Sequence, residues 1–228
     1  MKRTPFLEQA FSRLRPYRLQ LVMLFMGVLI PLCLFGVLAA EVTEQEGFFF
    51  DIPILMFMHS HATPLFDRTM LFFTHAGSRW SLVPIDILVF VFLMTQRHRA
   101  SALFWGFAVG GAALLNLAAK NFFARIRPDL WPSLAPETTF SFPSGHSVGS
   151  MAFAVALVML TWPTRWRWPV LLGATLFAFL VGLSRVYLGV HYPSDVIAGW
   201  AASLGWVVGL SVIFHERPTH PTPVLSAG

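Results

Sequence analysis

Three short clusters in the second half of the chain combine side chains that bind phosphate with side chains that attack it. Their sequences are KNFFARIRP at Lys120 to Pro128, PSGH at Pro143 to His146, and SRVYLGVHYPSD at Ser184 to Asp195. Cations neutralise phosphate oxygens, and a histidine oriented by a carboxylate is a nucleophile or a proton carrier. The clusters therefore predict a site that holds a phosphoryl group and cleaves it from its carrier.

The first cluster places two cations where both reach one ligand. Lys120 and Arg127 are seven residues apart, so they lie on one face if the helix continues as far as Pro128. Asn116, one turn before Lys120, is expected to support the site by hydrogen bonding. Pro128 disfavours a helical conformation at Arg127 and marks the helix end there. Alone, the two cations are equally compatible with side chains that reach from an apolar segment to water.

The second cluster has the order of a turn followed by a helix. Ser144 is a natural N-cap and Gly145 permits close backbone approach, so the helix start directs free N–H groups and its positive dipole end toward an anion. His146 is in the first turn, beside that anion. The alternative is a helix cap with a histidine at the interface.

The third cluster supplies the reactive pair. Arg185 closes an apolar segment and is suited to a bidentate clamp on phosphate oxygens. His191 and Asp195 are four residues apart, a spacing that lets the carboxylate accept a hydrogen bond from one imidazole nitrogen and leaves a lone pair on the other. Alternatively, Asp195 only partners the dipole of the helix that begins there.

Composition identifies the elements that position these residues. The chain of 228 residues is 56% hydrophobic and 12% charged, with a mean hydropathy of +0.64, which excludes an ordinary soluble domain. We predict an all-α, polytopic membrane bundle of about six transmembrane helices. The apolar segments are Leu19 to Ala40, Ser81 to Thr95, Ala102 to Ala119, Ser147 to Trp162, Trp168 to Leu188 and Val196 to Phe214.

Several features qualify this scheme. The second span is the least defined, because Phe66 to Thr74 is also apolar and is either an interfacial helix or an extension of that span. A signal peptide is the alternative for the first span. Pro31 and Pro84 are expected to kink their helices. Residues 1–215 are expected to form one domain with its motif-bearing core at about 100–215, followed by a disordered tail at 216–228.

The distribution of basic residues predicts the orientation. They precede the first span and follow the second, fourth and sixth, so by the positive-inside bias both termini are cytoplasmic. The opposite, outer side receives the loop Glu41 to Pro64 and all three clusters. The net charge of +5 then reflects cations that face anionic lipid headgroups, and no nucleic-acid partner is expected. The basic residues used are Lys2, Arg3, Arg13, Arg15, Arg18, Arg97, Arg99, Arg165, Arg167 and Arg217.

No metal site is expected. Cys33 is the only cysteine of the chain, so there is no disulfide and no cysteine-based metal centre. His59 and His61 on the outer loop offer two ligands, but no third ligand stands at a recognisable spacing. Asp86, an acidic residue inside the second span, is the one feature that favours a transporter or channel instead of an enzyme.

Read as Lys-x6-Arg-Pro, Pro-Ser-Gly-His and Ser-Arg-x5-His-x3-Asp, the clusters resemble the three motifs of the type 2 phosphatidic acid phosphatases, a family of membrane lipid phosphatases, over residues 100–215. The resemblance implies that His191 attacks phosphorus to give a phosphohistidine, that His146 protonates the leaving group and later activates water, and that Asp195 orients His191. It implies no cofactor and no metal. The phosphate oxygens are then held by Lys120, Arg127, Ser144, Gly145 and Arg185.

The expected substrate is a phosphorylated membrane lipid at the outer surface of a bacterial inner membrane. Undecaprenyl diphosphate, phosphatidylglycerol phosphate and phosphatidate all fit. The main alternative is a phosphotransferase that passes the phosphoryl group from the same His191 intermediate to a second lipid. Vanadium-dependent haloperoxidases resemble the same family, but they are soluble, which six apolar spans disfavour.

Overall fold

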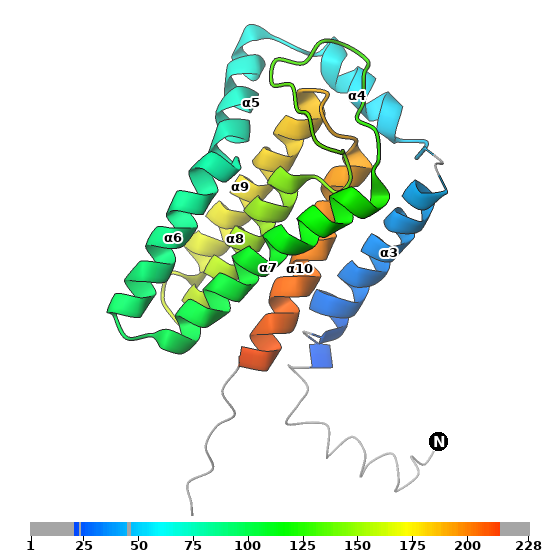
Figure 1. Ribbon diagram of the computed structural model, residues 1–228. Coiled ribbons are helices and arrows are strands. Elements are labelled where there is room, and N and C mark those ends of the chain that lie inside the picture. Colours follow the sequence, from blue (N-terminus) through cyan, green and yellow to red (C-terminus); the bar gives the residue numbers. More distant parts are fainter. Residues whose placement is uncertain (1–20, 23, 45–46, 215–228) are drawn as a thin grey trace, which may run out of the picture.

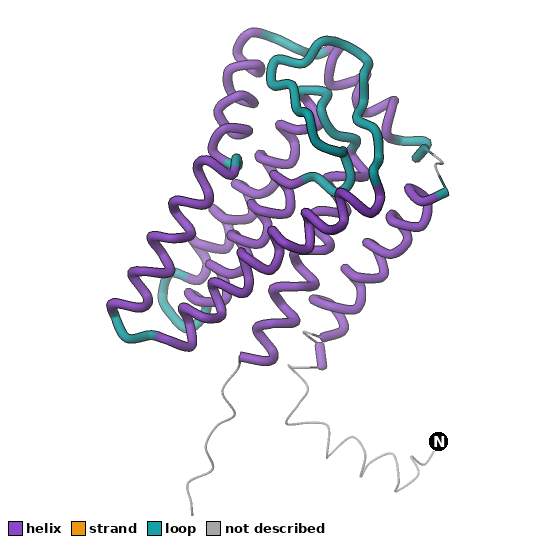
Figure 2. The backbone as a smooth tube through the Cα atoms, viewed as in Figure 1, coloured by secondary structure: helices purple, strands orange, loops and turns teal. Residues whose placement is uncertain are grey.

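The computed structural model describes residues 21–22, 24–44 and 47–214, and within them all regular structure is helical (Figure 2). The predicted tail at 216–228 and the basic residues before the first span lie outside the described residues. The helices are η2 (Phe25–Leu29, a π-helical turn), α3 (Ile30–Thr43), α4 (Asp51–Ser60), α5 (Pro64–Ala76), α6 (Arg79–Thr95), α7 (Arg99–Phe123), α8 (Gly145–Thr161), α9 (Arg167–Tyr187) and α10 (Pro193–Phe214).

Most of these helices have the length and composition of membrane spans. The continuous helix Phe25–Thr43, α7, α9 and α10 are each long and apolar enough to cross a bilayer. The pair α5 and α6 meets that criterion as one span bent by 43°, and α8 is apolar but only 17 residues long, about 26 Å. The membrane helical bundle is therefore confirmed, whereas the count of six spans stays a prediction.

Helix boundaries agree with the apolar segments to within a few residues from α6 onward. The uncertain segment Phe66 to Thr74 forms most of α5, a separate helix that continues into α6 across a bend at Gly77. A Cβ at Gly77 would lie 2.3 Å from Val181 of α9, so the bend brings the backbone directly against that helix. Pro84 lies within α6, and Pro31 follows the π-helical turn η2.

The expectation of an outer loop at Glu41 to Pro64 is wrong in one respect, because much of this segment is helical. Helix α3 continues to Thr43, and α4 crosses the end of the bundle (Figure 1). Asp51, expected on an interfacial loop, is the first residue of α4 and only 2% exposed. Its neighbour Phe49 is 89% exposed. A buried carboxylate needs partners, and these lie in the site described below.

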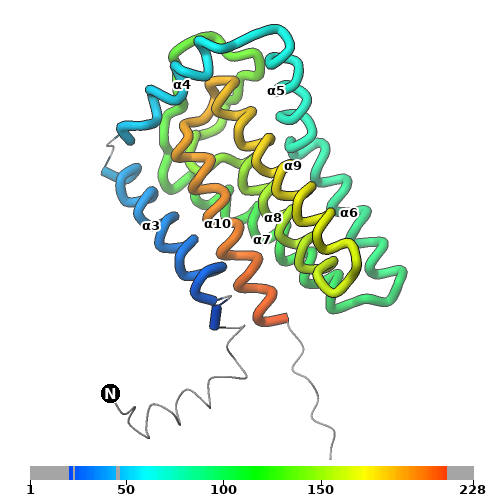
Figure 3. Tube along the Cα trace, turned by 180° about the vertical axis from the view of Figure 1, so that it is seen from behind, coloured from blue at the N-terminus to red at the C-terminus, as the bar shows by residue number. Residues whose placement is uncertain are grey.

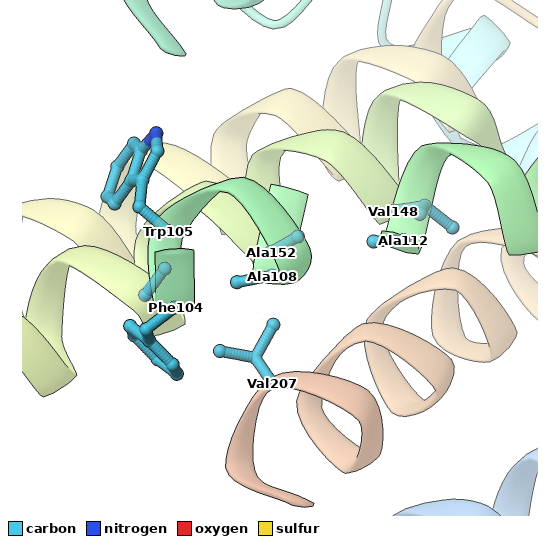
Figure 4. Packing of buried hydrophobic residues seen from close by; sticks show 8 residues of the cluster. Phe104, Trp105, Ala108, Ala112, Val148, Ala152 and Val207 are labelled. Carbon is cyan, nitrogen blue, oxygen red and sulfur yellow. The ribbon is translucent and has the colours of Figure 1, made fainter. Parts of the chain in front are cut away.

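Small side chains set the spacing of the central helices. Ala108 and Ala112 of α7, Ala152 of α8 and Val207 of α10 meet in one buried cluster (Figure 4). Because lipid tails are as apolar as these residues, close van der Waals packing between small side chains holds membrane helices together. Helices α7, α8 and α10, which carry parts of all three clusters, are therefore held close together.

Antiparallel neighbours bring the three clusters to one end of the bundle. The C-terminal ends of α7 and α9 and the N-terminal ends of α8 and α10 gather there, covered by α4 and the 124–144 loop (Figures 1 and 3). The short α6–α7 and α8–α9 turns lie at the other end. Helices joined by short connections alternate in direction, so residues 70 positions apart in sequence, such as Arg125 and Asp195, become neighbours.

The closest approach between α8 and α10 gives a stability prediction. A Cβ at Gly199 of α10 would lie 3.0 Å from both the Ser144 carbonyl oxygen and the Ser147 side chain. We expect Gly199→Ala to lower the free energy of unfolding by about 1–3 kcal/mol, as overpacking does, measured by thermal unfolding in detergent. Gly173→Ala on α9, where a Cβ would meet nothing within 4 Å, is the control and should unfold no earlier than wild type. Equal losses in both variants would contradict this account.

Candidate active site

The reactive pair lies in the turn between α9 and α10. His191 is 1% exposed, and its Nδ1 is 3.3 Å from Oδ2 of Asp195, at the start of α10. The turn is tight because the Arg185 carbonyl accepts the N–H groups of both Val190 and His191, and because Gly189 adopts φ +68°. The structure thus brings His191 and Asp195 into the contact that their spacing predicts.

The Asp195 carboxylate receives several donors besides His191. Oδ2 accepts from the Ser141 hydroxyl at 2.5 Å and from the Tyr192 N–H at 3.0 Å, and Oδ1 accepts from Arg125 Nη1 at 2.5 Å. Charge-assisted hydrogen bonds of this kind favour the ionised carboxylate. An ionised Asp195 can only accept, so His191 donates from Nδ1.

The other ring nitrogen of His191 faces a cation. Arg127 Nη1 lies 3.0 Å from His191 Nε2 and, because a guanidinium only donates, Nε2 carries the lone pair. Burial, followed by the charges of Arg127, Arg185 and Lys120, lowers the pKa of His191 well below its usual value. His191 is therefore neutral at physiological pH, with the lone pair of Nε2 turned toward Arg127.

Arg127 reaches this position from a loop, so the expectation of one helix carrying Lys120 and Arg127 is wrong. Helix α7 ends at Phe123, and Ala124 adopts a left-handed conformation with φ +46°. Arg127 Nε donates to the Thr139 carbonyl at 2.6 Å, and its Nη1 donates to the Val190 carbonyl at 2.6 Å. The loop therefore sets the direction of the guanidinium.

Lys120 and the start of α8 lie beside Arg127 and contribute to the same site. Lys120, 8% exposed, donates from Nζ to the Phe140 carbonyl, which also accepts from Arg127 Nη2 at 3.3 Å. A Cβ on Gly145 would lie 3.2 Å from Asn116 Nδ2 and 3.8 Å from Lys120 Cε. Gly145 thus permits the close approach that the sequence predicts, and Asn116 lies beside it.

Ser144 occupies the N-cap position of α8, as expected, but its side chain makes no capping hydrogen bond. Its hydroxyl is buried without a partner among the described residues. Its N–H instead donates to the Asp195 carbonyl at 3.1 Å, which ties the start of α8 to the start of α10. A helix start also leaves its first N–H groups without intrahelical partners, so this edge of the pocket offers several donors.

Arg185 and His146 meet at a carboxylate that the sequence analysis did not identify. Arg185 is 1% exposed and donates from Nη2 to Glu137 Oε1 at 2.7 Å and from Nη1 to the Thr74 hydroxyl. The same Glu137 oxygen lies 4.0 Å from His146 Nδ1. Arg185 thus already binds one anion, a carboxylate from the 124–144 loop.

Sequence reasoning also missed Ser141 and Asp51, and it gave Arg125, a basic residue of the first cluster, no specific role. Arg125 Nη2 pairs with Asp51 Oδ2 at 3.0 Å, while its Nη1 pairs with Asp195. Ser141 and Glu137 lie in a loop of irregular structure, so no periodicity marks them. The available signal was Asp51 itself, a carboxylate at the start of an apolar run.

The two loop histidines that were considered as metal ligands have other partners. His59 stacks on Trp131 with ring centroids 4.1 Å apart, and His61 Nδ1 contacts the Phe57 carbonyl at 2.9 Å. Across residues 24–44 and 47–214, no group of three or more His, Cys, Asp and Glu side chains could hold a metal ion.

An apolar groove of about 440 Å³ lies beside the cluster of cations. Its lining includes Asn116, which also lies beside Gly145, and its walls come from α3, α7, α8 and α10. Lining residues such as Leu115 and Ile213 are 51% and 77% exposed, so the groove is open to the surroundings of the bundle. The site thus combines a buried cluster of cations with an apolar groove that shares Asn116 with it.

The family model described as the PAP2 superfamily matches residues 87–218. Phosphatidylglycerophosphatase B of Bacillus subtilis (strain 168) is 35% identical over 146 residues, covering 62% of this chain and 71% of that protein. An undecaprenyl-diphosphatase of Sulfolobus acidocaldarius is 32% identical over 173 residues, covering 74% and 80%. The crystal structure of a transmembrane PAP2 type phosphatidylglycerolphosphate phosphatase from Bacillus subtilis has a TM-score of 0.68 and 31% identity, and it covers 78% of this chain and 94% of that chain.

The chain therefore belongs to the PAP2 superfamily, and the resemblance carried by the three motifs is confirmed. It is a membrane phosphatase of that superfamily.

The ion pair between Glu137 and Arg185 predicts an effect on anion binding. Because the carboxylate occupies a donor of Arg185 and adds negative charge to the pocket, we expect Glu137→Gln to bind inorganic phosphate about tenfold more tightly, equivalent to ~1.4 kcal/mol. The measurement is the inhibition constant for phosphate. Asp129→Asn, which removes an exposed charge from the same loop, should leave that constant unchanged. Equal constants in Glu137→Gln and wild type would show that Glu137 does not compete with the anion.

Proposed function

We propose that this protein removes the terminal phosphate from a phosphorylated membrane lipid through a phosphohistidine at His191. The observation that carries the proposal is the apolar groove that lies beside the buried cluster of cations. Asn116 borders both, since it lines the groove and lies beside Gly145. Such a junction suits a molecule with acyl or prenyl chains at one end and a phosphate at the other.

In the first step, the Nε2 lone pair of His191 attacks phosphorus opposite the leaving oxygen. The P–N bond forms as the bond from phosphorus to the lipid oxygen breaks, and His146 donates a proton to that oxygen. Asp195 accepts the Nδ1–H hydrogen bond and stabilises the positive charge that develops on the ring, as in a catalytic triad. In the second step, His146 takes a proton from water, which attacks phosphorus and releases inorganic phosphate and neutral His191.

Fixed cations stabilise the charge that accumulates on the equatorial oxygens. We assign this role to Lys120, Arg127 and Arg185, with the Ser144 hydroxyl and the N–H groups at Gly145. Two donors support the assignment: the Ser144 hydroxyl and Arg185 Nε are buried without partners among the described residues. Such groups destabilise the folded state unless a ligand or water satisfies them, and phosphate oxygens are suitable acceptors.

The substrate class follows from the groove and the pocket together. Lys120, Arg127 and Arg185 recognise a terminal phosphate and little beyond it, whereas the groove accepts an apolar chain without polar selection. We infer a broad enzyme that accepts polyprenyl diphosphates such as undecaprenyl diphosphate as well as phosphatidylglycerol phosphate and phosphatidate. The names of the relatives, one a phosphatidylglycerophosphatase and one an undecaprenyl-diphosphatase, support both groups.

This proposal predicts phosphate release from lipid phosphates by purified protein in detergent, in the presence of excess chelator. His191→Ala should form no phosphoenzyme, and His146→Ala should lose a rate factor of about 10² to 10⁴, the usual acid–base contribution. The measurement is inorganic phosphate from a panel of phosphorylated lipids and one water-soluble phosphate ester. Full activity of His191→Ala would refute the mechanism, and hydrolysis of the soluble ester as fast as of any lipid would refute the lipid assignment.

We further propose that the site faces outward from a bacterial inner membrane and that both termini are cytoplasmic. The two turns at the far end of the bundle carry Arg97 and Arg99, and Arg165 and Arg167. Basic residues in short loops favour the cytoplasmic side. At the opposite end, Lys120, Arg125, Arg127 and Arg185 are engaged in the site, so these four cations do not count against this orientation.

Cysteine labelling tests the orientation. Pro136 lies in the 124–144 loop and Thr164 in the α8–α9 turn, and both are exposed. In a Cys33→Ser background, a membrane-impermeant thiol reagent should label Pro136→Cys in intact spheroplasts but Thr164→Cys only after lysis. The reverse pattern would place the site in the cytoplasm.

A further inference from the structure

Arg125 differs from Lys120 and Arg127 in what it binds, and it differs from Arg185, which pairs with the single carboxylate of Glu137, in bridging two carboxylates. Arg127 and Lys120 donate to neutral backbone carbonyls, at Thr139, Val190 and Phe140. Arg125 instead bridges two carboxylates, with Nη1 2.5 Å from Asp195 Oδ1 and Nη2 3.0 Å from Asp51 Oδ2. A phosphate can displace a carbonyl from a guanidinium far more easily than it can displace two buried carboxylates.

Hydrogen bonds from Ser194 position Asp51 to pair with Arg125. Asp51 is 2% exposed, and its Oδ1 accepts the Ser194 N–H at 3.0 Å while its Oδ2 accepts the Ser194 hydroxyl at 2.6 Å. The Ser194 hydroxyl also accepts from Arg125 Nη1 at 2.8 Å. Asp51 thus connects α4 to both Arg125 and the residue next to Asp195.

The guanidinium is also held on its faces. Its central carbon lies 4.1 Å from the ring centroid of Tyr192 and 5.9 Å from that of Phe48. Aromatic faces attract a guanidinium and restrict its position. Arg125 therefore has one defined place, between the catalytic carboxylate and α4.

The two oxygens of Asp195 have different hydrogen-bond partners, and this difference indicates a role for Arg125. Oδ1 faces Arg125, and Oδ2 faces His191, Ser141 and the Tyr192 N–H. The Arg125 charge favours the ionised form of this buried carboxylate, and its bond to Oδ1 sets the rotation that presents Oδ2 to the His191 ring. Without that charge, a protonated Asp195 could donate to Nδ1 and so reverse the tautomer of His191.

We infer that Arg125, fixed by Asp51, is a positioning residue that acts through Asp195 to hold His191 in the tautomer with a lone pair on Nε2. It does not bind the phosphate. This inference rests on the proposed function of His191 as the nucleophile. It predicts that loss of Arg125 slows the chemical step and leaves phosphate binding intact.

The test compares Arg125→Met with Arg127→Met, using purified protein and a lipid phosphate substrate. For Arg125→Met we expect kcat and the rate of phosphohistidine formation to fall by roughly 10²-fold, as for a misplaced catalytic group. The inhibition constant for inorganic phosphate should stay within about threefold of wild type. Arg127→Met should instead raise that constant by about tenfold or more, a loss equivalent to one charge-assisted hydrogen bond. An Arg125→Met protein whose phosphate constant rises as much as that of Arg127→Met would overturn the inference.

Two further variants separate positioning from general loss of structure. Asp51→Asn keeps the shape of the side chain and should show a smaller decrease in kcat in the same direction. Adding Arg125→Met to Asp195→Asn should cause no further loss, because residues that act through one another are not additive. Arg68→Met, at an exposed arginine of α5, should match wild type. Additive losses of kcat would reduce Arg125 to a structural link and overturn the inference. A fraction of unfolded Arg125→Met protein large enough to account for its whole loss of kcat would do the same.

A spectroscopic readout keeps this test independent of catalysis. The nitrogen-15 chemical shifts of the His191 ring report its tautomer, and we expect the Nδ1–H form in wild type and a loss of that form in Arg125→Met. If wild type released no phosphate but the Nδ1–H form present in wild type was lost in Arg125→Met, the proposed function would fail while the positioning role stood. If wild type were active and the tautomer and kcat were unchanged in Arg125→Met, the positioning role would fail and the function would stand.

Discussion

The burial of the Asp195 carboxylate at the start of an apolar helix dictates the arrangement of the residues around it. A buried carboxylate without partners is strongly destabilising, and Asp195 is fully buried. Its donors come from separate parts of the chain: Arg125 after α7, Ser141 before α8, and His191 and Tyr192 before α10. Satisfying this carboxylate therefore holds together the connections that form the pocket.

Charge around His191 is divided between its two ring nitrogens. On the Nδ1 side, Arg125 lies between the carboxylates of Asp195 and Asp51. Arg127 lies at Nε2, and the charges of Arg127, Arg185 and Lys120 lower the pKa of His191. The carboxylates on the first side are paired with Arg125, whereas Arg127 and Lys120 are held by neutral carbonyls, so under the proposed mechanism an anion reaches these two cations without breaking an ion pair.

The bundle supplies the rigidity that this division requires. Small residues at Ala112, Ala152 and Gly199 bring α7, α8 and α10 close together, and the Ser144 N–H donates to the Asp195 carbonyl at their common end. Helices packed this closely cannot slide without clashes. The apolar outer surfaces of the same helices face lipid, so one set of helices both anchors the protein and aligns the site.

The sequence by itself determined the membrane-helix class, the positions of the helices from α6 onward, and the convergence of the three clusters, because long apolar segments joined by short connections imply antiparallel helices. It also indicated the His191–Asp195 contact, since a separation of four residues across a tight turn leaves little freedom. Only the tertiary structure decided that α7 ends at Phe123, that Arg127 acts from a loop, and that Asp51, Glu137 and Arg125 join the site. These features depend on how an irregular loop and α4 fold over the bundle to satisfy buried charges, and such long-range pairing leaves no periodic pattern in the chain.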